Sequence, residues 1–300
     1  LYTVVDTMIV GQTLGVSALA ALGAAESLGW MSLGSIQGLT QGFSIRMAQQ
    51  FGAKDEDRLH QAVGHSIVLS ALLAVLLTIV FQVAVRPVLA ILQTPEDIKP
   101  DTILYLRILF SGIPIVVAYN LLASMLRAIG DSKTPLIATA IAAASNIVLD
   151  LLFVCVFGWG IAGAAWATII GQFFSAMLVL GYLPKFHTVK LSLHDFMPKP
   201  RFLKMVMALG AAACFNQLAI FVTQIVMNNV LRYYGALSIY GSDIPLAVVG
   251  VGSKVNMVFL SIVIGISQGA QPIIGFNYGA AQYSRCLLYT SDAADEARSV

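Results

Sequence analysis

The chain has 300 residues, of which 58% are hydrophobic and only 11% are charged, and its mean hydropathy is +0.83. A soluble domain carries about 25% charged residues, so this composition excludes an ordinary soluble enzyme. The net charge of +2 gives no basic surface for nucleic acid. The three cysteines, Cys155, Cys214 and Cys286, fit neither a disulfide framework nor a metal-binding spacing. The sequence therefore predicts an integral membrane protein without a nucleic-acid partner.

Apolar segments recur along the whole chain. A membrane-spanning helix needs about 20 mostly apolar residues, and Gly, Ala and Ser within such segments let membrane helices approach one another closely. In chain order the expected segments are 1–14 (already in progress at the first residue), 18–45, 61–85, 102–126, 135–157, 161–183, 203–233 and 246–276. The pattern predicts an all-α membrane protein with eight transmembrane helices.

Lys and Arg residues gather in alternate loops, which predicts the orientation, because cytoplasmic loops carry the excess of basic residues. Eleven follow the second, fourth, sixth and eighth segments, against four on the opposite side. The first set of loops, with the long polar linker 184–202, is expected in the cytoplasm. The linker separates an amino-terminal six-helix lobe, 1–183, from the first two helices of a second lobe, 203–285.

An internal repeat supports this division. Residues 19–53 align without a gap onto residues 246–280, with nine of 35 positions identical, Gln41/Gln268, Gly42/Gly269 and Gly52/Gly279 among them. Both copies run from outside to inside, so the repeat is parallel. Parallel halves around an axis along the membrane normal are a transporter architecture. The repeat predicts two six-helix lobes, of which the second stops here after two helices.

The end of the chain, 286–300, continues no apolar pattern and reads like a translated sequencing adapter. We expect this tail to have no counterpart in the gene, and the chain to be a fragment of a longer protein whose first helix is truncated.

Ionisable residues inside membrane segments are costly and indicate functional sites. Asp6, Glu26, Asp150 and Lys254 lie well inside the expected segments, away from their ends. Asp6 and Asp150 lie about 12–13 Å from the outer ends of their helices, and Thr168 lies about 10 Å deep, at 1.5 Å per residue. Asn146 precedes Asp150 by one turn and shares its helix face.

We expect Asp6, Asn146, Asp150 and Thr168 to form one cluster. Oxygen ligands suit a hard cation such as Na⁺, and a carboxylate pair readily holds a proton. The alternative is two isolated acids, each satisfied by backbone groups. Three further residues are candidates for lining a substrate cavity: Asn120, Glu26 and Gln217. Glu26 could equally face water without a transport role, and Lys254 could pair with an acid or reach a polar cavity.

Five stretches together resemble the multidrug and toxic compound extrusion (MATE) family, in its DinF-like or MepA-like bacterial branch. They are 5–7 (Val-Asp-Thr), 126–135 (Leu-Arg-Ala-Ile-Gly-Asp-Ser-Lys-Thr-Pro), 146–150 (Asn-Ile-Val-Leu-Asp), 158–168 and 271–279. The resemblance implies a twelve-helix, two-lobe transporter of the bacterial plasma membrane. It also implies multidrug efflux of organic cations in exchange for Na⁺ or H⁺ as the coupling ion.

The branch carries an acid on helix 1, an Asn and an Asp on helix 5 and a Thr on helix 6, which fall on Asp6, Asn146, Asp150 and Thr168. Its pocket Asn on helix 4 falls on Asn120. The other main branch uses an acid on helix 7, where this sequence offers Gln217, so coupling through that helix is not supported.

The expected protein is a monomeric antiporter without a resident cofactor, in contact with membrane lipid. One alternative is a flippase for a lipid-linked oligosaccharide or polysaccharide, which would need a basic cavity. An intramembrane enzyme is disfavoured because the segments hold no catalytic motif, and a channel is disfavoured by the two-lobe repeat.

Overall fold

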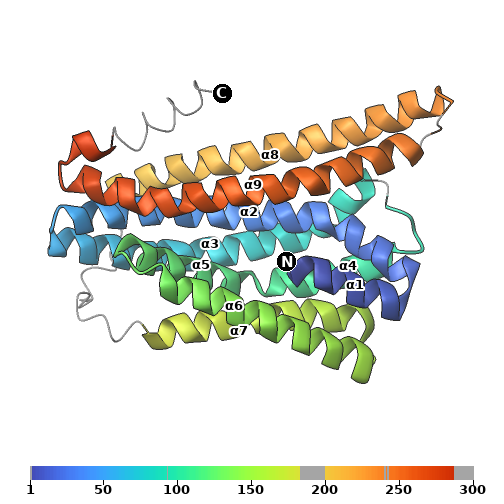
Figure 1. The fold of residues 1–300 in the computed structure, drawn as a ribbon, viewed down its shortest axis with the longest axis horizontal. Coiled ribbons are helices and arrows are strands. Elements are labelled where there is room, and N and C mark those ends of the chain that lie inside the picture. The colour runs from blue at the N-terminus through green and yellow to red at the C-terminus, as the bar shows by residue number, and fades with distance from the viewer. Residues whose placement is uncertain (1, 93, 183–199, 240, 242, 287–300) are drawn as a thin grey trace.

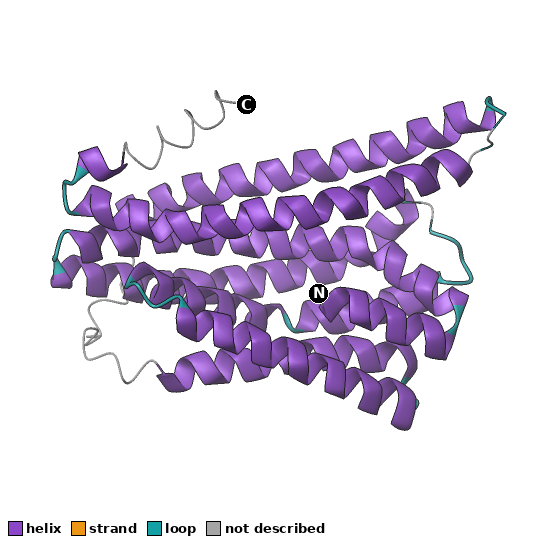
Figure 2. Cartoon of the chain, in the orientation of Figure 1, coloured by secondary structure: helices purple, strands orange, loops and turns teal. Residues whose placement is uncertain are grey.

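The structure, a computed structural model, describes residues 2–92, 94–182, 200–239, 241 and 243–286. These residues form long helices that lie side by side, with the chain turning at the two ends of the bundle (Figure 1). Within the described residues every regular element is a helix, and short loops join them (Figure 2). The all-α prediction is confirmed.

The amino-terminal part contains seven α-helices and one π-helical segment, η1. Their bounds are α1 (Tyr2–Leu14), α2 (Val16–Gly52), α3 (Glu56–Ile91), α4 (Lys99–Ser111), α5 (Ile113–Ala128), α6 (Lys133–Asp150), η1 (Leu151–Val156) and α7 (Gly160–Tyr182). Two further helices follow, α8 (Pro200–Ala236) and α9 (Asp243–Gly279). Each of the eight expected segments falls on one or two of these helices.

Within the described residues, five stretches are each long and apolar enough to span a membrane. They are 16–52, 56–91, 133–156, 160–182 and 259–279. The fourth expected segment is broken into α4 and α5, which meet at a 45° bend, and counting this pair as one span raises the number to six. α1 has only 13 residues.

Short polar motifs set the helix ends. Gly15 separates α1 from α2 with a φ of 85°, which favours glycine. The carboxylate of Asp55 accepts a hydrogen bond of 3.0 Å from the Arg58 backbone N–H and so caps α3.

Asp131 caps α6. Its Oδ1 accepts the backbone N–H groups of Lys133 and Thr134, both at 3.0 Å, and its Oδ2 accepts the Thr134 hydroxyl at 2.6 Å. Burial would raise the pKa of the Asp131 carboxyl, but the hydrogen bonds from Thr134 and Lys133 outweigh it and hold that pKa below its usual value. The ionised carboxylate therefore stabilises the start of α6.

The loops alternate between the two ends of the bundle. The turns after α2, α5 and α9 lie at one end, and those after α1, α3, η1 and α8 lie at the other (Figure 1). This agrees with the alternation used to predict orientation, and the assignment of the first end to the cytoplasm stays a prediction.

Two predicted segments lie largely outside the described residues. They are the linker 184–202, of which only 200–202 are described, and the tail 286–300, of which only Cys286 is described. α8 begins at Pro200, three residues before the expected boundary. The Cys286 thiol lies 3.7 Å from the Ile274 carbonyl oxygen, so the first residue of the expected tail contacts α9.

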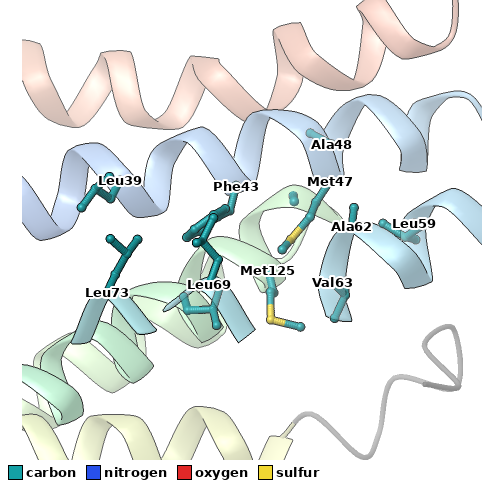
Figure 3. Packing of buried hydrophobic residues seen from close by; sticks show 12 residues of the cluster. Leu39, Phe43, Met47, Ala48, Leu59, Ala62, Val63, Leu69, Leu73 and Met125 are labelled. Atoms are coloured by element: carbon teal, nitrogen blue, oxygen red, sulfur yellow. The ribbon is translucent and has the colours of Figure 1, made fainter. Parts of the chain in front are cut away.

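α2 is the central helix, lying between α9 and α3 (Figure 1). Near its carboxyl end, Phe43 and Met47 point toward Leu69 of α3 and Met125 of α5 (Figure 3). Phe43 is fully buried there. In a membrane this cluster is held by close van der Waals packing, because lipid tails are as apolar as the side chains.

α2 and α9 are copies of one unit. Each has 37 residues, and α2 begins at Val16 and ends at Gly52, while α9 begins at Asp243 and ends at Gly279. The two carboxyl ends, Gly52 and Gly279, are equivalent in the alignment of the repeat, and the two starts have the same offset of 227 residues.

Candidate functional site

Three helices of the amino-terminal part bring polar side chains together. α1 packs against both α6 and α7, and α6 and α7 pack along each other. Asp6 lies on α1, Asn146 and Asp150 lie on α6, and Thr168 lies on α7. Asp6, Asn146 and Asp150 are 5%, 3% and 0% exposed, and Thr168 is partly buried.

Direct contacts join these four residues in two pairs. The Asn146 side-chain amide donates to the Thr168 hydroxyl at 3.4 Å, and that hydroxyl donates to the Ala164 carbonyl oxygen at 3.1 Å. The carboxyl groups of Asp6 and Asp150 lie within hydrogen-bonding reach of each other and can share a proton. Asn146 and Asp150, one turn apart, connect the two pairs.

Close approach of α7 to α6 makes the first pair possible. A Cβ atom at Gly171 would lie 3.0 Å from the Ala142 carbonyl oxygen and 3.3 Å from the Asn146 Cβ. Only a glycine leaves that space free, so Gly171 lets α7 lie against the turn of α6 that carries Asn146.

The backbone changes its winding directly after Asp150. The last α-helical residue of α6 is Asp150, and η1 follows at once over Leu151–Val156. π-helical turns are rare and occur frequently at functional sites. The wider turn changes the rotation of the helix at the level of Asp150. Sequence reasoning missed this feature, since no residue type in 151–156 announces it.

Four buried acceptor atoms in the cluster have no hydrogen-bond donor: Asp6 Oδ1, Asn146 Oδ1 and both carboxylate oxygens of Asp150. A buried acceptor without a partner is costly, and more so when it is charged. Two carboxylates in contact inside a membrane also repel each other strongly. The arrangement is therefore suited to receive a proton or a small hard cation.

The substrate-cavity candidates lie on other helices than this cluster. Asn120 donates its side-chain amide to the Val116 carbonyl oxygen at 2.8 Å, one turn earlier on α5. Glu26 is exposed on α2 and accepts a hydrogen bond of 3.4 Å from the Trp30 indole N–H. The side chain of Gln217, on α8, lies directly over Gly34 of α2. The side chain of Lys254 lies outside the described residues.

No group of three or more His, Cys, Asp or Glu side chains suited to a metal ion occurs in the described part of the chain. In the polar cluster the two carboxyl groups are accompanied by the Asn146 amide and the Thr168 hydroxyl.

Residues 1–152 and 212–291 match the family model MatE, which covers more than half of the chain. The chain belongs to the MatE family.

Curated relatives of the chain carry the names of drug transporters. The chain is 32% identical over 286 residues to the probable multidrug resistance protein YoeA of Bacillus subtilis, covering 91% of this chain and 60% of that protein. It is 26% identical over 254 residues to the multidrug export protein MepA of Staphylococcus aureus, covering 83% of this chain and 54% of that protein. The chain thus spans between half and two thirds of the length of these relatives.

Solved structures of MATE transporters have the same fold. An outward-facing multidrug resistance MATE transporter of the MOP superfamily superposes with a TM-score of 0.87 at 25% identity, over 96% of this chain and 62% of that one. An inward-facing multidrug resistance MATE transporter of the same superfamily superposes with a TM-score of 0.74 at 27% identity, over 93% of this chain and 60% of that one. The MatE chain is a multi-pass protein of the bacterial plasma membrane, and its family consists of transporters and not of enzymes.

Proposed function

We propose that the full-length protein exports small organic, mainly cationic molecules by antiport with Na⁺ or H⁺. The observation that carries this proposal is the set of four buried oxygen acceptors without donors on Asp6, Asn146 and Asp150. A proton or Na⁺ would satisfy these oxygens and remove the repulsion between the two acids. The names of the relatives, multidrug resistance and multidrug export proteins, support drugs as the substrates.

Ion binding and substrate binding would be linked through charge. With the site empty of cations, Asp6 and Asp150 give the amino-terminal lobe a negative charge that attracts organic cations. A coupling ion neutralises that charge and tightens the contacts between α1, α6 and α7. A ligand shifts a conformational equilibrium only by its differential affinity for the two states. Ion entry would therefore favour the state that releases the drug, as antiport requires.

The substrate itself would bind between the lobes. Glu26 and Gln217 lie on helices of different lobes, α2 and α8, which pack against each other. An exposed carboxylate beside an indole is suited to an organic cation, because the ring face and the charge both attract positive groups. Asn120 adds a carboxamide on α5.

A flippase for a lipid-linked oligosaccharide remains the second candidate within the superfamily. It would need basic groups for a pyrophosphate between the lobes. Glu26, Asn120 and Gln217 are acidic or neutral, and these side chains favour a cationic substrate.

The test uses the full-length protein reconstituted in liposomes with a fluorescent organic cation. One arm applies a Na⁺ gradient at equal pH, and the other applies a pH gradient without Na⁺. The variants Asp150→Asn and Asp6→Asn preserve side-chain size but remove the charge, and we expect ion-driven efflux to be lost in both. Asp131→Asn, an acid outside the membrane segments, should retain it. Full efflux by a folded Asp150→Asn protein would refute the proposal.

A further inference from the structure

A close backbone contact joins the two lobes at the carboxyl ends of α2 and α9. A Cβ atom at Gly52 would collide with the Phe276 carbonyl oxygen, and one at Gly279 would collide with the Gln49 carbonyl oxygen. One turn earlier, a Cβ at Gly275 would lie 3.0 Å from the Ala48 Cβ. Two helices can cross this tightly only where the residues at the contact are small.

This contact is symmetric under the internal repeat. In the alignment of residues 19–53 with 246–280, Gly52 is equivalent to Gly279, Ala48 to Gly275 and Gln49 to Phe276. Gly52 contacts the carbonyl oxygen of Phe276, and Gly279 contacts that of Gln49. Because Gln49 and Phe276 are equivalent in the repeat, the two contacts are equivalent as well. The pseudo-two-fold axis that relates the lobes passes through the crossing.

A cleft with a mainly apolar lining lies beside the crossing. It has a volume of about 390 Å³ and is lined by residues of both helices, four carboxamides among them: Gln41, Gln49, Gln268 and Gln271. The two helices are thus in direct contact at the two glycines and separated by the cleft beside them.

The end of the bundle that carries the crossing is the one assigned to the cytoplasm by the basic loops. It is closed here, and the chain superposes better on an outward-facing MATE transporter (TM-score 0.87) than on an inward-facing one (0.74). A transporter that faces outward must be closed on its cytoplasmic side.

We propose that Gly52 and Gly279, with Ala48 and Gly275, form a symmetric latch that closes the cytoplasmic side and must separate once in every transport cycle. The latch rests on the proposed antiport between an outward-facing and an inward-facing state but needs no coupling ion to form. Side chains larger than glycine at 52 or 279 prevent the backbones from meeting, and so weaken the outward-facing state relative to the inward-facing one.

The first experiment is disulfide trapping in the full-length protein with its native cysteines replaced by serine. The pair Ala48→Cys and Gly275→Cys places two Cβ atoms 3.0 Å apart, so the helices need to separate by less than about 1 Å to reach the ~3.8 Å of a disulfide. We expect rapid cross-linking on oxidation, arrest of efflux, and recovery on reduction, while each single-cysteine variant transports throughout. Failure to cross-link, or undiminished efflux by the cross-linked protein, would overturn the proposal.

The second experiment enlarges the glycines and measures labelling of Gln268→Cys, in the cleft, by a membrane-impermeant maleimide from the cytoplasmic side. Overpacking at Gly52→Ala or Gly279→Ala should raise the labelling rate by roughly tenfold. Gly23→Ala on α2 and Gly265→Ala on α9 add the same methyl group where no atom lies within 4 Å, and should leave the rate unchanged. Equal rates in all four variants would contradict the latch.

These readouts separate the latch from the coupling site. Cross-linking and labelling need no ion gradient, so normal efflux by Asp150→Asn would remove the proposed coupling mechanism and leave the latch standing. Loss of ion-driven efflux in Asp150→Asn together with a failure of the cysteine pair to cross-link would remove the latch and leave the coupling mechanism standing.

Discussion

Gly171→Ala tests the packing that holds the polar cluster together. The added methyl group would lie 3.0 Å from the Ala142 carbonyl oxygen and 3.3 Å from the Asn146 Cβ. Both distances are shorter than ordinary van der Waals contact, so α7 must move away from α6 by a few tenths of an ångström. The hydrogen bond from Asn146 to Thr168, already 3.4 Å long, would then exceed hydrogen-bonding distance.

The magnitude follows from two opposing effects. Overpacking a close contact costs about 1–3 kcal/mol, whereas replacing a helical glycine by alanine gains about 0.5–1 kcal/mol. The net loss of unfolding free energy is then about 1 kcal/mol. For a chain of this size that lowers the melting temperature by about 2–4 °C. Loss of the Asn146–Thr168 hydrogen bond should weaken coupling-ion affinity about two- to tenfold.

The assay is thermal unfolding of the detergent-solubilised full-length protein, followed by the ion concentration that gives half-maximal efflux. Gly181→Ala is the matched control, because it lies on the same helix with no atom within 4 Å of a Cβ. It should raise the melting temperature and leave ion affinity unchanged. If Gly171→Ala behaves like Gly181→Ala in both measurements, the close packing of α7 on α6 does not support the site.

Three further results are expected. Asp131→Asn should lower stability at pH 7 by at most about 1 kcal/mol. Because the pKa of Asp131 is lowered in the folded state, this difference is fully present above the unfolded pKa of about 4 and is lost as the pH falls below it through the folded pKa, in melting curves recorded across pH. Thr168→Val, which keeps the shape and removes the hydroxyl, should cost about 1 kcal/mol in coupling-ion affinity, and unchanged ion dependence of efflux would exclude Thr168 from the site. Lys190→Cys should be labelled only from the cytoplasmic side of the membrane, and labelling from outside intact cells would reverse the predicted orientation.

Local patterns in the sequence were sufficient for much of the fold. Apolar runs located every described helix, since the length and composition of a membrane helix are set by the thickness of the bilayer. The repeat placed α9 over α2, with Gly52 and Gly279 at equivalent ends. The residue types of the cluster were also readable, because a carboxyl group in an apolar helix is conspicuous and helix rise gives its depth.

The fourth expected segment shows where local pattern fails. The run 102–126 is continuous in hydropathy, yet the chain bends by 45° between α4 and α5. Gly112 lies at the bend, where a Cβ would lie 2.7 Å from Ile169 of α7. The bend thus occurs where α7 packs against the chain, a long-range contact that hydropathy does not encode.

The polar cluster was likewise predictable from the sequence only in part. Composition and spacing placed Asp6, Asn146, Asp150 and Thr168 in one layer of the membrane, but the rotation of α1, α6 and α7 about their axes decided which oxygens meet. That rotation depends on close packing between helices distant in sequence, as at Gly171. The two glycines of the α2–α9 crossing were visible in the sequence as repeated residues. Only the tertiary structure showed that they are in contact, because a glycine permits close packing of another helix but does not determine which helix packs there.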